Sequence, residues 1–353
     1  MNKLFCMLLM FNGLVFLSAQ NLNSKKSEFI EFNSVQIDTL FQDKISIRAI
    51  VVDDDKVWYA ADKNRFGFFD LKRNKKFEDV IVEDTLKLEF RSIAKTKDFV
   101  YVLSVGNPAI LYQISKDGKT KKRVYKEVNK KVFYDSMQFW NDKEGIAVGD
   151  PLVDRLCVLK TIDGGFTWYK LPENSLPNVF DGEAHFAASN SNIVIKGNNT
   201  WIVSGGKNAR VFYSANKGNT WDVYDTSIVQ GKQMTGIFTA DFYDAKNGFI
   251  AGGDYEIQNQ KNGNKAITDS GGKSWKPVSE NEGFGFASCV QYIPKSNGNG
   301  IVVVGASGLN YSADKGKTWK IFSLDSTLYT IRFVDEKTAI AAGKNKVIRV
   351  RFN

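Results

Sequence analysis

The sequence predicts an all-β protein, a seven-bladed β-propeller, and three observations lead to this fold class. Four eight-residue stretches are near-copies of one another: TIDGGFTW (161–168), SANKGNTW (214–221), TDSGGKSW (268–275) and SADKGKTW (312–319). Their starting positions differ by 53, 54 and 44 residues, the range of propeller-blade repeats. The chain also has only six prolines against 29 glycines, with many β-branched and aromatic residues, which favours strands joined by tight turns.

The third observation is that each copied stretch stands at the same place in a longer pattern. An apolar stretch with small residues is followed by a strand ending in Gly, by a strand leading into the copied turn, and by a strand after the Trp. One unit reads FASCVQYIP, GIVVVGASG and LNYSADKGKTWKIF over residues 286–322. We therefore expect blades of about four antiparallel strands at residues 46–83, 89–127, 132–171, 183–225, 235–280, 285–322 and 326–353.

The last unit provides only three strands before the chain stops. Residues 33–41 precede the first unit and are expected to supply the missing strand, which would close the ring and cover its edges. Six or eight blades are the alternatives to this count.

The first twenty residues, MNKLFCMLLMFNGLVFLSAQ, have one lysine, an apolar run and then Ser18-Ala19. This layout predicts a signal peptide over residues 1–19, and hence a protein exported to the periplasm or the cell exterior. The alternative is a membrane anchor, but the run is shorter than the roughly 20 apolar residues of a bilayer span. Residues 20–353 are then expected to form a single propeller domain that is not an integral membrane protein.

Charge and cysteine content exclude several function classes. The net charge is +9, but the lysines are interleaved with acids, which indicates a solvated basic surface rather than a nucleic-acid site. Outside the predicted signal peptide only Cys157 and Cys289 remain, both within strand-like stretches and without zinc-ligand spacing. We expect two buried thiols, no metal and no cofactor, and the oligomeric state stays open.

The copied stretch resembles the Asp-box of BNR-repeat proteins, Ser/Thr-x-Asp-x-Gly-x-Thr-Trp. Two copies match it fully, with Asp163 and Asp314 in the acidic position, whereas the other two carry Asn216 and Ser270 there. The chain is also similar to exported BNR-like propellers related to the photosystem II stability/assembly factor, within the sialidase-like architecture. The box residues have structural roles in a tight turn and between blades. They are Asp163, Trp168, Asn216, Trp221, Trp275, Asp314 and Trp319.

Propeller geometry places candidate binding residues at the opposite end of the ring from these turns. They open the first strand of a unit or follow the Gly that ends the second: Arg48, Arg91, Asp135, Asp150, Glu183, Arg210, Asp254 and Tyr255. Arginines beside acids suit a polar ligand with a carboxylate, a peptide terminus or a sugar. Alternatively, these groups pair with each other across the channel. The resemblance implies recognition of a protein segment through an arginine-bearing face, with Arg48, Arg91 and Arg210 as the nearest candidates.

The alternative function is that of a glycoside hydrolase of sialidase-like architecture. Such an enzyme would use two carboxylates, and Asp135, Asp150, Glu183 and Asp254 are the candidates for catalysis. The Phe-Arg-Ile-Pro signature of sialidases is absent, because Ser92 follows Arg91. The single histidine, His185, lies in no nucleophile-elbow pattern. We therefore expect a binding or assembly-factor-like module whose partner is a protein segment or a carbohydrate-like polar ligand.

Overall fold

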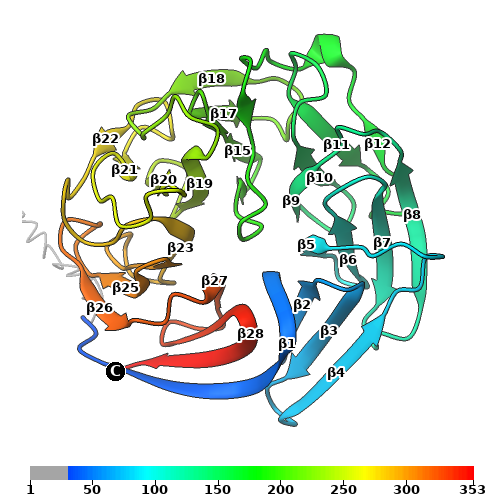
Figure 1. The fold of residues 1–353 in the computed structure, drawn as a ribbon, viewed down its shortest axis with the longest axis horizontal. Coiled ribbons are helices and arrows are strands. Elements are labelled where there is room, and N and C mark those ends of the chain that lie inside the picture. Colours follow the sequence, from blue (N-terminus) through cyan, green and yellow to red (C-terminus); the bar gives the residue numbers. More distant parts are fainter. Residues whose placement is uncertain (1–30) are drawn as a thin grey trace, which may run out of the picture.

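The computed structural model describes residues 31–353, so the predicted signal peptide at residues 1–19 lies outside the described residues. Within that range the chain forms 28 strands and one 3₁₀ helix, η1 (Glu173–Ser175). The strands are grouped as blades around a central axis (Figure 1). None of the helical structure in residues 31–353 has the length and apolar character needed to cross a membrane. The prediction of an all-β propeller is confirmed.

Four of the six sheets have four strands each. The first two contain β5 (Phe90–Lys95), β6 (Phe99–Ser104), β7 (Ala109–Ser115) and β8 (Lys121–Glu127), and then β9 (Tyr134–Phe139), β10 (Gly145–Gly149), β11 (Cys157–Thr161) and β12 (Tyr169–Lys170). The other two contain β14 (Ile193–Lys196), β15 (Asn199–Val203), β17 (Arg210–Ser214) and β18 (Asp222–Asp225), and then β23 (Ala287–Tyr292), β24 (Ile301–Gly305), β25 (Gly308–Ser312) and β26 (Lys320–Ser323).

Two sheets have six strands each. One joins β13 (Glu183–Ala184) and β16 (Gly205–Gly206) to β19 (Thr235–Phe242), β20 (Gly248–Asp254), β21 (Lys265–Thr268) and β22 (Lys276–Pro277). The other has the order β27 (Leu328–Phe333), β28 (Thr338–Phe352), β1 (Val35–Asp53), β2 (Lys56–Ala61), β3 (Arg65–Asp70) and β4 (Lys75–Val80).

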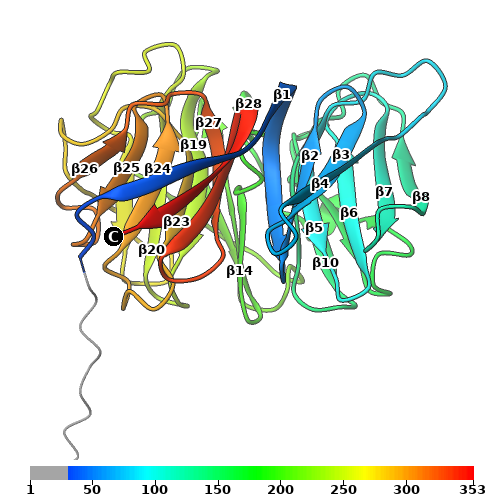
Figure 2. The same ribbon diagram turned by 90° about the horizontal axis from the view of Figure 1, so that it is seen from below.

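The prediction of seven blades is wrong, because strand pairing in residues 31–353 gives six sheets. Strand β1 has 19 residues and pairs with β28 over its first part and with β2 over its last part, so two expected blades merge into one sheet. The ring is also not closed by a separate N-terminal strand. Residues 33–41 instead lead into and form the beginning of β1, which lies beside β28 along the edge of the ring (Figure 2).

The hydrophobic core lies between neighbouring sheets. In one cluster Trp58 and Phe66 of β2 and β3 pack against Ile93 and Val102 of β5 and β6, and all four side chains are buried. Each such side chain contributes about 1.5–3 kcal/mol through burial. These faces therefore hold neighbouring blades together.

The strands of each sheet are antiparallel, so successive connections alternate between the two ends of the ring. We call the end with the hairpin turns β1–β2, β3–β4 and β11–β12 the turn face, and the opposite end the cavity face. The copied stretches lie on the turn face. In the first, Asp163 accepts hydrogen bonds from the amide of Thr167 at 3.0 Å and from its hydroxyl at 2.6 Å.

The tryptophans of these turns pack at the blade boundaries. Trp168 is buried against Tyr101 of the preceding sheet and donates its Nε1 proton to the Gly165 carbonyl at 3.2 Å. Gly165 has a φ of +84°, and a Cβ there would lie 2.6 Å from the Tyr101 ring. Asp314 and Trp319 make the corresponding bonds in the last copy. Asn216 accepts the Thr220 amide in the same way, beside the half-buried Trp221, while Trp275 bonds to Gly272.

Candidate functional site

Six inner strands carry a β-bulge at the same place in the repeat. The register of each strand shifts at one residue, which has no partner opposite it: Arg48, Arg91, Asp135, Phe238, Ser288 and Tyr329. A bulge bends the strand and changes the direction of its side chain, and bulges are frequent beside functional sites. Six inner strands, which belong to five of the six sheets, thus each present one bulged residue near their start, at the cavity face.

A cavity of about 500 Å³ opens on the cavity face. This volume falls within the range of ligand pockets. Four bulged residues line it, together with loop residues and residues from the segment after β13. The lining comprises Arg48, Arg91, Phe133, Asp150, Ala184, His185, Phe186, Ala187, Ala188, Gln233, Met234, Phe238, Tyr255, Phe286 and Ser288.

One wall of the cavity is cationic. The Arg48 guanidinium stacks on the Tyr329 ring at 4.2 Å and forms no ion pair with any carboxylate of residues 31–353. Burial and the neighbouring Arg91 lower the pKa of Arg48, yet an arginine in a protein keeps its charge. Arg91 pairs with Glu89 at 2.8 Å, and both side chains are partly exposed. The wall therefore offers donors that an anionic group could bind.

Two carboxyl groups lie beside this wall. Asp150 lines the cavity and accepts the His185 backbone amide at 2.8 Å, while burial raises its pKa. Asp135 is fully buried, and within the described part of the chain its carboxylate oxygens make no hydrogen bond of normal geometry, the Ala187 amide being a weak neighbour. Burial and the nearby Asp150 raise the pKa of Asp135, although Arg91 opposes this effect. These carboxyl groups therefore compete only weakly with a ligand for the arginines.

The opposite wall is aromatic. Phe186 stacks on Phe238 with ring centroids 3.8 Å apart, and Phe286 meets Phe238 edge-on at 4.6 Å. Tyr255 contacts Phe286 edge-on at 5.2 Å and stays 42% exposed, and Met234 completes the wall. Aromatic pairs favour these offset and edge-to-face arrangements. The buried Phe238 and Phe286 thus hold the more exposed rings in fixed positions.

The floor of the cavity comes from residues 185–192, which we call the floor segment. Its bonds reach inner strands all around the axis. Asn190 donates to the Ile93 carbonyl at 2.8 Å and accepts the Met137 amide at 2.9 Å. Ser189 donates to the Ser288 carbonyl, and Arg332 donates to the Ser189 carbonyl at 3.0 Å. The segment thus crosses the channel and gives the cavity a closed end.

His185 begins the floor segment, and one of its ring nitrogens makes a hydrogen bond. Its Nδ1 lies 2.9 Å from the Val203 carbonyl. A carbonyl only accepts, so Nδ1 carries a proton, and Nε2 is the nitrogen that faces away from this bond. Nε2 has no hydrogen-bond partner within residues 31–353.

Three predicted residues take part in structural contacts instead of lining the cavity. The Glu183 carboxylate accepts two hydrogen bonds from the Arg210 guanidinium, at 3.0 and 2.5 Å, and one from the Ser204 hydroxyl at 2.6 Å. Glu183 and Arg210 thus form a buried ion pair. Asp254 accepts Lys232 at 3.1 Å and two loop amides. Burial opposes its ionisation, but these donors lower the pKa of Asp254.

These placements also bear on the hydrolase alternative. Of its four candidate carboxylates, only Asp150 lines the cavity among the described residues. Asp135 lies below the surface, and Glu183 and Asp254 are already bonded to cations. The cavity wall therefore presents one carboxylate where a two-carboxylate scheme needs two.

Several lining residues were absent from the sequence prediction. Ser288 stands at the same bulge as Arg48, so an alignment of the repeats could have found it. Phe186, Gln233 and Met234 lie where the units differ from one another, and their position in the sequence gives no comparable signal.

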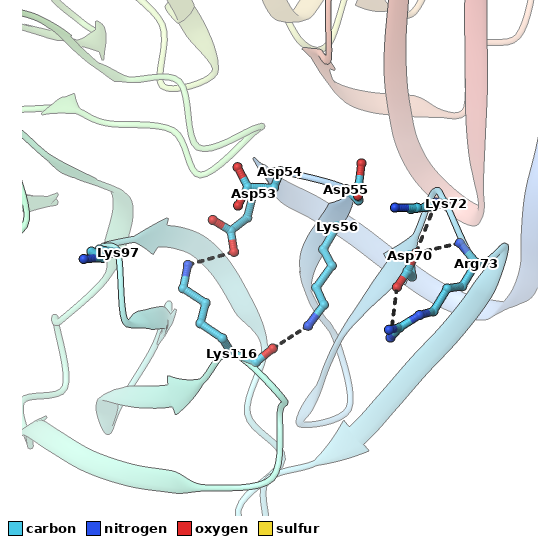
Figure 3. A pocket seen from close by; sticks show the side chains of 9 residues that line it. All are labelled: Asp53, Asp54, Asp55, Lys56, Asp70, Lys72, Arg73, Lys97 and Lys116. Carbon is cyan, nitrogen blue, oxygen red and sulfur yellow. Dashed lines mark hydrogen bonds and ion pairs between the residues drawn. The ribbon is translucent and has the colours of Figure 1, made fainter.

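A second open cavity of about 520 Å³ lies on the turn face, between the first two units of the chain (Figure 3). Among the described residues, Asp53 and Asp70 are paired with Lys116 and Arg73, whereas the unpaired charged side chains are exposed: Asp54, Asp55, Lys72 and Lys97. Lys116 binds Asp53 at 2.8 Å, and Asp70 accepts the backbone amides of Lys72 and Arg73. This arrangement fixes the hairpin turns and provides no buried unpaired charge for a ligand, so the cavity face carries the stronger candidate site.

Within residues 31–353 no three His, Cys, Asp or Glu side chains gather as a metal site would require. Both Cys157 and Cys289 are free and buried thiols.

No protein-family model matches the sequence, so the resemblance to Asp-box repeats is not shown by that comparison, and no curated protein matches it either. Solved structures show the fold. The chain is similar to YCF48 bound to a D1 peptide, with a TM-score of 0.65 and 14% identity over 92% of this chain and 99% of that one. YCF48 from Cyanidioschyzon merolae gives a TM-score of 0.64 at 13% identity, covering 91% and 99% of the two chains. The WD40 repeats of RRP9 give 0.62 at 10% identity, covering 92% and 100%. At these identities the likeness establishes a β-propeller and nothing finer.

Proposed function

We propose that this protein is a binding module that captures a segment of a partner protein at the cavity face, as an assembly factor does. The observation that carries the proposal is the cationic wall. Arg48 and Arg91 reach one cavity from two neighbouring inner strands, and Arg48 has no carboxylate partner within residues 31–353. Arg48 is half-buried, and a guanidinium that is partly removed from water without an anion is costly to keep, so a ligand carboxylate would stabilise it.

Two further observations support a protein partner. Exposed apolar side chains stand on loops at the same end of the ring as the cavity, outside its lining: Val128, Val153, Phe180 and Ile257. Such side chains suit the contact area of a protein interface more than a small polar solute. A propeller of similar fold, YCF48, is bound to a D1 peptide. We further propose that the chain is exported after loss of residues 1–19, which mass spectrometry of the N-terminus of the cellular protein would test.

The proposal is tested by capture of a partner from a cell-envelope extract, followed by cross-linking that locates the contact. The purified protein is compared with an Arg48→Gln/Arg91→Gln variant. A matched control, Lys207→Gln/Arg155→Gln, removes two charges from loops of the same face outside the cavity. We expect a partner that cross-links beside the cavity, is lost with the first variant and is kept by the control. Equal capture by both variants would contradict the proposal.

A further inference from the structure

The two unlike walls of the cavity define the chemistry of the bound group more narrowly than the fold does. Arg48 and Arg91 lie on one side, whereas Phe186, Met234 and Tyr255 form the other. A ligand that fills the cavity therefore meets charge and aromatic surface at the same time.

The cationic wall selects for a carboxylate. Arg48 is held by the Tyr329 ring at 4.2 Å and by a long contact of 3.5 Å to the Ala188 carbonyl, so its position is fixed without an acid. Arg91 is tied only to a partly exposed Glu89. Planar guanidinium groups bind carboxylates with two parallel hydrogen bonds.

The aromatic wall selects for a ring. The Tyr255 ring is 42% exposed and rests edge-on against the buried Phe286. Phe186 is clamped in a stack on Phe238. The flexible Met234 side chain can adapt to a ring beside it. A pocket with rigid backing and an adaptable rim is typical of an interface hot spot that takes an aromatic anchor.

We propose that the cavity recognises a carboxylate next to an aromatic ring, as in an acidic residue that adjoins a phenylalanine in an exposed segment. The carboxylate binds between Arg48 and Arg91, and the ring packs on Phe186, Met234 and Tyr255. This inference rests on the proposed function, because it describes the part of the partner that enters the cavity. A side-chain carboxylate and a chain-terminal carboxylate share this chemistry, and the probes below distinguish them.

The test uses unlabelled hexapeptides with the purified protein and isothermal titration calorimetry. Four amidated peptides carry Glu-Phe, Gln-Phe, Glu-Ala or Gln-Ala at their centre, and a fifth ends in Gln-Phe with a free carboxylate. We expect the Glu-Phe peptide or the free-acid peptide to bind at least tenfold more tightly than the peptides that lack the carboxylate, the aromatic ring or both. A preference for the free acid would assign the carboxylate to a chain end and also support the inference.

Variants then assign the two walls. Arg48→Gln or Arg91→Gln should remove the preference for a carboxylate, so that the amidated Glu-Phe and Gln-Phe peptides bind with similar affinity. Tyr255→Ala should weaken the ring-bearing peptides about tenfold. Its matched control is Tyr169→Ala, because Tyr169 is 41% exposed on the outer strand β12 and lies outside the cavity. Melting curves verify that each variant is folded.

Equal binding of all the peptides, or equal loss from Tyr169→Ala and Tyr255→Ala, would overturn the inference. Absence of peptide binding by a protein that still captures a partner through Arg48 and Arg91 would overturn it as well, while leaving the proposed function in place. Conversely, selective peptide binding without any captured partner would support the ligand chemistry and count against the proposed function.

Discussion

Replacing Glu183 by alanine should strongly destabilise the protein, because it breaks a buried ion pair from one side. The Glu183 side chain is 0% exposed and that of Arg210 is 10% exposed. Four hydrogen bonds to the carboxylate would be lost: two from Arg210, one from Ser204 and one from the amide of Phe180. Arg210 would keep only the Asn178 carbonyl and two flanking rings among the described residues.

The expected cost follows from the charge that stays behind. Removing one partner of a buried pair typically costs about 3–5 kcal/mol, because the remaining ion is neither hydrated nor paired. That is a large share of the roughly 5–15 kcal/mol by which domains are stable. Urea denaturation followed by tryptophan fluorescence would measure the loss as a lower transition midpoint.

Two controls make this measurement specific. Asp181→Ala breaks the pair of Asp181 with Lys207, whose side chains are 97% and 56% exposed, and should cost less than about 1 kcal/mol. Glu183→Leu combined with Arg210→Met removes both charges and should be more stable than Glu183→Ala. If Glu183→Ala costs no more than Asp181→Ala, the argument that this pair holds the structure together is refuted.

Three further predictions concern other buried or bonded groups. Asp135→Asn should raise the free energy of unfolding near neutral pH. Burial raises the pKa of Asp135 in the folded state. The wild-type protein therefore loses stability as the pH rises from about 4, where the carboxyl group ionises in the unfolded chain, up to the pKa of the folded state. Melting temperatures at several pH values should show a gain that grows with pH, and a gain independent of pH would count against this account. Lys265→Met should also stabilise the protein at pH 7, because burial lowers the pKa of Lys265 to about 8 and makes the charged form unfavourable in the folded state. Between about pH 8 and 10.4 the wild-type protein should regain up to about 1.4 kcal/mol of stability per pH unit relative to the variant, as measured by urea titrations. A stability difference that does not change with pH would contradict this prediction. Asp163→Ala should cost about 1 kcal/mol through the lost bonds to Thr167, whereas Asp163→Asn should cost less, since Asn216 makes the same amide contact to Thr220; equal costs in denaturant unfolding would argue against a hydrogen-bonding role.

The repeat made the fold class readable from the sequence. It also indicated where inner strands begin, and the structure places Arg48, Arg91, Asp150 and Tyr255 around one cavity. The number of blades could not be predicted from the sequence, because it depends on whether β1 and β28 are each one continuous strand or two shorter ones. Backbone pairing carries both strands through the expected boundary without a break.

The rest of the site depends on contacts between distant parts of the chain. The floor segment interrupts the fourth unit, and its Asn190 bonds to Ile93 and Met137, at separations that no local pattern reports. The same departure from the repeat turns Glu183 and Arg210 toward each other, so two residues expected at the mouth form a buried pair. Tyr255 of the aromatic wall was predicted, whereas Phe186 and Met234 were not predicted, because they have no counterparts in the other units.

The pairing of β1 with β28 also sets the order in which the molecule can be completed. The amide of Asn33 donates to the Asn353 carbonyl at 2.8 Å, and that of Asn353 donates to the Ser34 carbonyl at 3.0 Å. β1 therefore cannot complete its sheet until β28, about 300 residues later in the sequence, has been synthesised. Contacts of such long sequence separation make folding slow, and the unpaired edge of β1 is exposed to wrong partners during that interval. A chain truncated before β28 would lack this pairing altogether, so the fifteen residues of β28 (Thr338–Phe352) are required to complete this sheet.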